Sequence, residues 1–199
     1  MRIVLSRKGF DASNGKFPSP ILKSHGNEMF SLPIPETCCH SPAPAYSEIT
    51  FDGRSLGQAV ADLTQGKVQA NNKAHLDPDL CRGSVCREDK ESWKPLFGQA
   101  STAERHLQIQ EVGKEDIFLF YGWFRKAQYV DGSYSYIPNA PDLHVIFGWL
   151  QIDRWIKSEE WESEAAWAKG HPHCKPEPCA CYWKRKNQKN SEQETKECC

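Results

Sequence analysis

The chain has 199 residues, of which 39% are hydrophobic and 26% are charged, and its formal net charge is -1 at pH 7. This length suits one domain with a real core, and the near-zero charge excludes binding to long nucleic acid through a global basic field. No apolar run approaches the roughly 18–20 residues of a membrane helix, and the N-terminal apolar stretch is too short for a signal peptide. We therefore expect a cytoplasmic protein with no membrane partner.

The first half of the chain predicts a mixture of short strands and one helix. Residues 2–6 are typical of a strand, and residues 21–22 and 29–35 of a hairpin. Apolar residues at helical spacing predict a helix over 55–64, with Ser55 capping its start. A second helix is expected from Ser101, where a serine followed three residues later by glutamate forms a capping box, to about residue 111.

Residues 113–152 are the centre of the predicted core. Two aromatic and β-branched runs, 118–124 and 145–151, nearly repeat each other, and each contains a Gly-Trp pair. Such runs predict two buried, antiparallel strands, with the polar residues 125–142 as a long loop between them. A glycine inside each strand indicates a bulge or a surface that a ligand or a neighbouring backbone approaches closely.

The C-terminal part changes character after a last predicted helix over residues 159–169. Residues 174–199 are rich in Pro, Lys, Glu and Gln and carry five of the nine cysteines. This composition has almost nothing to bury and predicts a disordered tail. The fold class expected is thus α+β: one domain over residues 1–173, with a mixed or antiparallel β core, a few flanking helices and a disordered tail.

The sharpest chemical cluster is His75-Leu-Asp77-Pro-Asp79. Two carboxylates spaced by one residue can hold a hard cation such as Mg²⁺, which prefers oxygen ligands and usually also contacts a phosphate. The same pair can act as an acid and a base if the two pKa values are pushed apart. Asp-Pro-Asp is also ordinary turn chemistry, so a purely structural role remains open.

Other side chains offer weaker signals. His171, His173, Cys174, Cys179 and Cys181 are of the ligand types that zinc prefers, but their spacing matches no strong zinc motif, and reduced thiols are the simpler interpretation. Trp123 and Trp149 belong either to the core or to a cleft in which they stack a base. His144 is typical of a structural histidine before a buried strand.

The combination of motifs resembles a known family. The matching segments are 5–11, 18–21, 31–35, 75–79, 97–99, 118–125, 143–151 and 171–173. Together they resemble the third of the nucleotide modification associated domain families, bacterial and phage proteins that genomic association links to systems that modify bases in DNA. The resemblance covers residues 1–173. It implies, without assigning roles, the family positions Arg7, Lys8, Asp11, His75, Asp77, Asp79, Gln99, Arg125, His144, Gln151, His171 and His173. A fainter similarity to small β-barrels of the PUA, ASCH and EVE kind makes such a barrel one form that the core can take.

Three functional hypotheses follow. In the first, the protein is an enzyme of nucleotide or DNA-base modification, with His75, Asp77 and Asp79 as catalytic residues, Asp77 and Asp79 as ligands for Mg²⁺, and Arg7, Lys8 and Arg125 on phosphate. In the second, it is a non-catalytic reader of modified bases that uses Trp123, Trp149 and Gln99. Asp11 and His144 complete the expected binding residues. In the third, it is a truncated and inactive member of the family.

Overall fold

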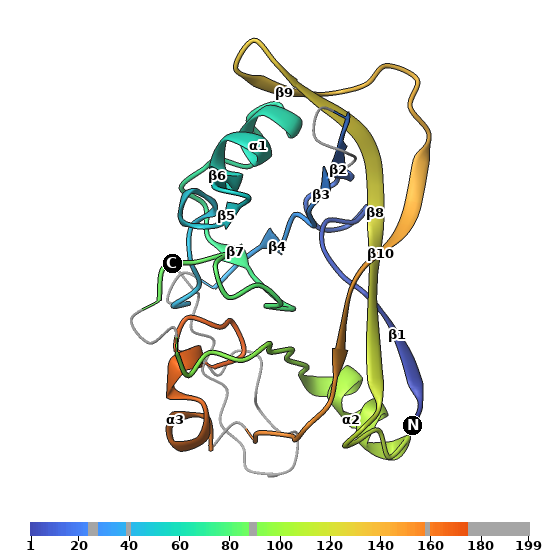
Figure 1. Ribbon diagram of the computed structural model, residues 1–199, viewed down its shortest axis with the longest axis vertical. Helices are drawn as coiled ribbons and strands as arrows, with labels where there is room; N and C mark the ends of the chain where they lie inside the picture. The colour runs from blue at the N-terminus through green and yellow to red at the C-terminus, as the bar shows by residue number, and fades with distance from the viewer. Residues whose placement is uncertain (24–27, 39–40, 88–90, 158–159, 175–199) are drawn as a thin grey trace, which may run out of the picture.

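The computed structural model describes residues 1–23, 28–38, 41–87, 91–157 and 160–174 (Figure 1). Among these residues it contains a six-stranded sheet, two small two-stranded sheets and three α-helices. The predicted α+β class is therefore confirmed. No helix of the described residues is long and apolar enough to cross a membrane.

The long strand β8 (Ile117–Val130) organises the sheet and runs along most of the molecule in Figure 1. Its side chains alternate between the two faces, as the pleat of a strand requires. Phe118, Phe120 and Phe124 are buried, whereas Leu119, Tyr121 and Trp123 are only half-buried. The face with the phenylalanines points into the molecule.

Both edges of β8 are paired. Along one edge it pairs in parallel with β1 (Ile3–Arg7) and then with β2 (Ser19–Leu22). Along the other edge it pairs antiparallel with β10 (Asp142–Gln151) and then with β9 (Ser133–Tyr136). The hairpin predicted at the N-terminal side is present as β2 with β3 (Glu28–Met29). The sheet stays open, so the barrel form is not adopted.

The predicted loop between the two central strands is wrong over its first part. β8 continues through Arg125 to Val130 and turns at Asp131-Gly132, where both residues have positive φ, into β9. Positive φ at both central positions suits a tight hairpin, for which Asp-Gly is a preferred sequence. Residues 125–130 extend the strand because β2 supplies a partner for residues 125–127 and β9 for residues 127–130.

The predicted glycine bulge lies in β10. The register between β10 and β8 shifts between Ile146 and Gly148, so Phe147 is the extra residue. A bulge moves the residues that follow it onto the other face relative to a regular strand. Trp149 consequently shares a face with Ile146 and His144.

Two of the predicted helices are present with changed ends, and the third is broken. α1 (Leu56–Leu63) begins as expected, with Ser55 Oγ accepting the Gly57 N–H at 3.0 Å. α2 (Ser101–Ile109) has Ala100, not Ser101, as its N-cap residue. In place of one helix over 159–169, α3 (Trp161–Glu164) and the short 3-10 helix η3 (Ala166–Ala168) are separated by Ala165, whose φ of -147° is not helical.

The remaining elements are short. They are β4 (Ile34–Pro35) paired with β7 (Ala74–His75), β5 (Thr50–Phe51) paired with β6 (Arg54–Ser55), and the 3-10 helix η2 (Tyr46–Glu48). β4 and β7 lie between α1 and α3 in Figure 1, and the segment that leaves β7 carries the acidic motif.

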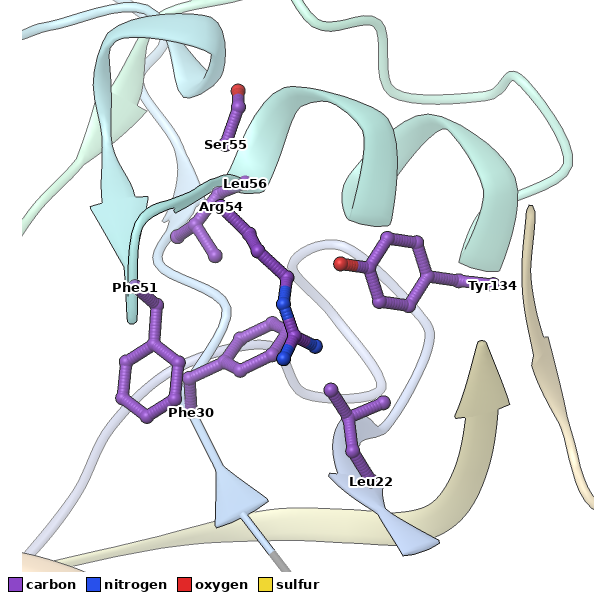
Figure 2. Close-up of a pocket in the computed structure, with 7 residues that line it drawn as sticks. All are labelled: Leu22, Phe30, Phe51, Arg54, Ser55, Leu56 and Tyr134. Atoms are coloured by element: carbon purple, nitrogen blue, oxygen red, sulfur yellow. The ribbon is translucent and has the colours of Figure 1, made fainter. Parts of the chain in front are cut away.

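The core has two main parts. One packs α1 and η2 against β2 and the far end of β8, and it includes Tyr46 and Val60. The other packs α2 and the phenylalanines of β8 around Phe120. Beside the first part, Figure 2 shows a shallow hollow with no room for a water molecule, into which the Arg54 side chain extends. None of the predicted site residues line this hollow.

The predicted tail falls almost wholly outside the described residues. Cys174, the first residue of that segment, is buried against Ala165 and Ala168 and thus belongs to the folded part. Residues 175–199, with Cys179 and Cys181, lie outside the description, so the predicted disorder stays a prediction.

Candidate functional site

The carboxylate of Asp77 is the hub of the candidate site. Its side chain is completely buried, two residues after β7. The Lys8 ammonium, just beyond β1, donates to Asp77 Oδ2 at 2.8 Å, and the Gly98 N–H donates to Oδ1 at 2.8 Å. Burying a carboxylate is costly unless it is paired and hydrogen-bonded in this way.

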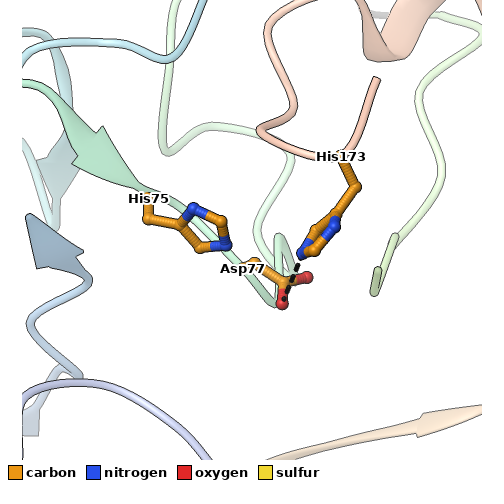
Figure 3. A group of neighbouring side chains, drawn as sticks. All are labelled: His75, Asp77 and His173. Atoms are coloured by element: carbon orange, nitrogen blue, oxygen red, sulfur yellow. Dashed lines mark ion pairs between the residues drawn. The ribbon is translucent and has the colours of Figure 1, made fainter. Parts of the chain in front are cut away.

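Three histidines gather around this carboxylate. His171 Nε2 lies 3.3 Å from Asp77 Oδ1, and His173 Nε2 lies 3.6 Å from Oδ2. The His75 ring packs edge-on against the His173 ring, with 5.1 Å between the ring centroids. Figure 3 shows His75 and His173 on opposite sides of Asp77. We call Lys8, His75, Asp77, His171 and His173 the Asp77 centre.

The electrostatics of the centre keep Asp77 ionised. Burial by itself raises the pKa of this carboxyl, but the Lys8 ammonium, His171 and His173 outweigh burial and hold the pKa well below its usual range. Burial lowers the pKa of His171, and Asp77 opposes that shift only in part. The centre thus combines a carboxylate anion, a lysine cation and a neutral His171.

His171 presents an N–H donor to the centre. Its Nδ1 accepts the His173 backbone N–H at 3.3 Å, so the proton of the neutral ring is assigned to Nε2. This Nε2 is buried 3.3 Å from Asp77 Oδ1. The contact is less well aligned than a regular hydrogen bond, but the proximity of the ring helps to hold the pKa of Asp77 low.

A buried glutamate, Glu36, fixes the orientation of the His75 ring. His75 Nδ1 lies 3.3 Å from Oε2 of Glu36, whose side chain is 4% exposed. Glu36 also accepts the Cys38 N–H at 2.9 Å and the Ser41 hydroxyl at 3.1 Å. This orientation turns His75 Nε2 toward Asp77 (Figure 3). Glu36 carries no motif signal beyond following Pro35, so its role is not predictable from the sequence.

Phe97 and Gly98 pack against two side chains of the centre, Lys8 and His173. The Lys8 ammonium lies 4.4 Å from the centroid of the Phe97 ring, a favourable cation–π distance. A Cβ atom on Gly98 would lie 2.3 Å from Cδ2 of His173, so this position accepts only glycine if the imidazole is to stay in place. Gln99 follows in the chain and is half-buried.

Asp79 belongs to a different network. It forms an ion pair with Arg87, and it accepts from Trp93 Nε1 at 3.3 Å and from Ser84 Oγ at 3.4 Å. Its backbone pairs with Leu96. Only Pro78 separates Asp77 from Asp79 in the motif, but their carboxylates have separate partners, and the shared Mg²⁺ site stays a prediction.

Most of the remaining expected binding residues lie on the other face of the sheet. On β8, Tyr121 is opposite Arg7 of β1 and Ile146 of β10, and Trp123 is opposite His144. Trp149, opposite Leu119, is 64% exposed, and Leu5 is 65% exposed. We call this surface the outer sheet face; its members are Leu5, Arg7, Leu119, Tyr121, Trp123, His144, Ile146 and Trp149.

Two expected binding residues have local partners. Asp11 accepts the backbone N–H groups of Ser13 at 2.7 Å and Asn14 at 2.6 Å, as in an ordinary Asx turn. Arg125 Nε donates to Asp142 Oδ1, its cross-strand neighbour, at 2.6 Å. Apart from Gln99, which follows Gly98, the predicted binding residues therefore divide between the Asp77 centre, the outer sheet face and these two local contacts.

Comparison with known proteins identifies the family to which the chain belongs. No curated protein and no solved structure matched the chain. The family described as nucleotide modification associated domain 3 matches residues 2–195, which includes the whole Asp77 centre and extends past His173, where the resemblance was expected to end. Because this match spans nearly the full length, the chain belongs to the nucleotide modification associated domain 3 family.

Proposed function

We propose that the protein is an enzyme of a nucleotide modification system that acts on a nucleotide or a nucleic acid base at the Asp77 centre. The observation that carries this proposal is the fully buried Asp77 carboxylate, which gathers Lys8 and two histidines from distant parts of the chain. A buried ionic cluster is a poor way to gain stability, since apolar packing serves as well. Perturbed titratable groups of this kind concentrate at functional sites.

The arrangement suits proton transfer. His75 and His173 are partly exposed, with 23% and 20% of their side chains accessible, and they form the side of the centre that a substrate can reach. Imidazole is the side chain best suited to acid–base catalysis near neutral pH. Asp77 orients the imidazoles, His171 donates from Nε2, and the Lys8 ammonium supplies positive charge for a phosphate or a developing oxyanion.

A second candidate function uses the outer sheet face. Exposed Trp149 and half-buried Tyr121 and Trp123 lie near Arg7 and His144, and aromatic rings interleaved with basic groups stack and hold single-stranded bases. This surface favours a reader of modified bases. It requires no chemistry at Asp77.

One thermal-shift experiment separates the two functions. The purified full chain is melted with deoxynucleoside mono- and triphosphates and with short single-stranded DNA, with and without Mg²⁺. The comparison uses Asp77→Asn and His173→Gln for the centre and Trp149→Ala for the outer face. The enzyme proposal expects a nucleotide-dependent rise in Tm that both centre variants lose and Trp149→Ala keeps.

The opposite pattern supports the reader, and a shift that survives all three variants contradicts both sites. His173→Gln guards against a folding defect, because its side chain is at the accessible side of the centre and Asp77 keeps Lys8 and Gly98 as partners. A protein that melts cooperatively but responds to no nucleotide or oligonucleotide contradicts the proposed function.

A further inference from the structure

We propose that His75, Asp77 and His173 bind one divalent transition metal ion of the zinc, iron or manganese class. Among the described residues, these three side chains form a cluster of potential metal ligands. Their ligand atoms all lie within 4.8 Å of one another. Two imidazoles and one carboxylate form a ligand set that suits these ions and not Mg²⁺, which takes oxygen ligands. The inference rests on the proposed function, because it names the cofactor of the same centre. With the ion bound, His75 and His173 would serve as ligands, and the acid–base role would pass from their imidazoles to a water at the open coordination position.

The distances are close to those of a bound ion. With bonds of about 2.1 Å, ligand atoms in a tetrahedral site are about 3.4 Å apart. His173 Nε2 and Asp77 Oδ2 are already 3.6 Å apart. His75 faces the same carboxylate (Figure 3), and the ligand atoms of all three residues lie within 4.8 Å of one another.

The surroundings of the three ligands match those of metal sites. A metal-bound imidazole usually gives its second nitrogen to a carboxylate, which fixes the ring and raises its basicity. Glu36 holds that position on Nδ1 of His75, and is itself held by Cys38 and Ser41. Gly98 leaves the room that the His173 ring occupies.

His171 adds a donor beside the three ligands. Its Nε2 is buried 3.3 Å from Asp77 Oδ1, a contact that helps to hold the pKa of Asp77 low but lacks the alignment of a regular hydrogen bond. Three protein ligands leave one coordination position open for water or substrate. An oxygen atom at that position is a natural acceptor for the His171 N–H.

Lys8 is the competitor of the ion. Its ammonium lies on the same Asp77 oxygen that faces His173. Lysine is flexible, and 17% of this side chain is exposed, so a bound ion can displace it toward solvent or substrate. This competition gives the inference a specific consequence: removal of the lysine charge strengthens metal binding.

The test is a titration of the chelator-treated full chain with Co²⁺ and Zn²⁺, followed by calorimetry and by the visible spectrum of cobalt. We expect one ion per chain, with d–d bands and without the thiolate-to-cobalt charge-transfer band. Glu36→Gln weakens binding by about 10–100-fold, and His75→Gln or Asp77→Asn by more. Lys8→Met tightens it. His106→Gln, at an exposed histidine of α2, leaves it unchanged.

Cysteine alkylation excludes the thiols as the source of binding. Retention of the cobalt spectrum after alkylation supports the inference. Binding that survives His75→Gln and Asp77→Asn but is lost on alkylation assigns the ion to cysteines and overturns it, as does stabilisation by Mg²⁺ alone or the absence of Co²⁺ binding. Metal binding without any response to nucleotides contradicts the proposed function but supports the metal site. A response to nucleotides without metal binding contradicts the metal site alone.

Discussion

Lys8 Nζ and Asp77 Oδ2 lie 2.8 Å apart, although 69 residues separate them in the chain. This ion pair joins the end of β1 to the segment after β7 and thereby connects the large sheet to the acidic motif. Lys8 and Arg7 are neighbours in sequence but serve different surfaces: Lys8 points into the Asp77 centre, whereas Arg7 lies on the outer sheet face.

Removal of the lysine charge leaves Asp77 with a buried, undercompensated negative charge. We expect Lys8→Met to lower the free energy of unfolding of the metal-free protein by about 3 kcal/mol, as when one partner of a buried ion pair is deleted. Urea unfolding at pH 7 measures this. Lys67→Met is the matched control, because the Lys67 ammonium lies 5.2 Å from the centroid of the Phe17 ring in an exposed setting and its loss costs less than about 1 kcal/mol. Equal losses in the two variants would show that the pair has no special role.

The glycine at position 98 is required by the His173 ring. Gly98→Ala places a methyl group 2.3 Å from Cδ2 of His173, so the ring must move, and we expect a loss of about 1–3 kcal/mol in unfolding free energy. Nitrogen NMR of the imidazoles reports the displacement directly. Gly83→Ala is the control, since a Cβ there meets nothing within 4 Å. An unchanged His173 signal in Gly98→Ala would contradict the packing described.

Asp116 makes stability depend on pH in the acid range. The N–H groups of Gly113, at 3.0 Å, and of Arg2, at 2.6 Å, donate to its carboxylate and lower its pKa. Because the folded-state pKa is depressed, the stabilisation is complete above the unfolded-state value of about 3.9 and is lost as pH falls through the folded-state value. We expect the stability difference between the wild type and Asp116→Asn to be constant above about pH 5 and to shrink below about pH 4. A difference that does not vary over this range would contradict the contribution of the ionised carboxylate.

The sequence predicted those parts of the fold in which local pattern and tertiary packing agree. The aromatic run around Phe120 and the Ser55 cap were sufficient to place β8 and α1. Residues 125–130 were missed because they are held as a strand by β2 and β9, partners that local composition does not indicate. The break at Ala165 likewise reflects packing of Ala165 and Ala168 against Cys174 and not helix propensity.

The sequence indicated which residues belong to the candidate site better than it indicated which of them contact one another. Asp77, Lys8 and the histidines stood out by residue type, but nothing in the spacing of the Asp-Pro-Asp motif indicated that Arg87 and Trp93 hold Asp79. Glu36 carried no signal because its role depends on a contact with His75 across the β4–β7 pair. Sequence spacing cannot reveal which face of the sheet Trp149 occupies, because the bulge in β10 sets its register against β8.

The most direct test of the account is nitrogen NMR of the histidine side chains during titration of the full chain with deoxynucleotides. If the Asp77 centre is the site of action, the imidazole signals of His75, His171 and His173 shift together and saturably, while His144 and the indole signals of Trp123 and Trp149 stay in place. Saturable shifts confined to His144 and the indoles, with the three centre histidines unmoved, would contradict the account and assign nucleotide binding to the outer sheet face.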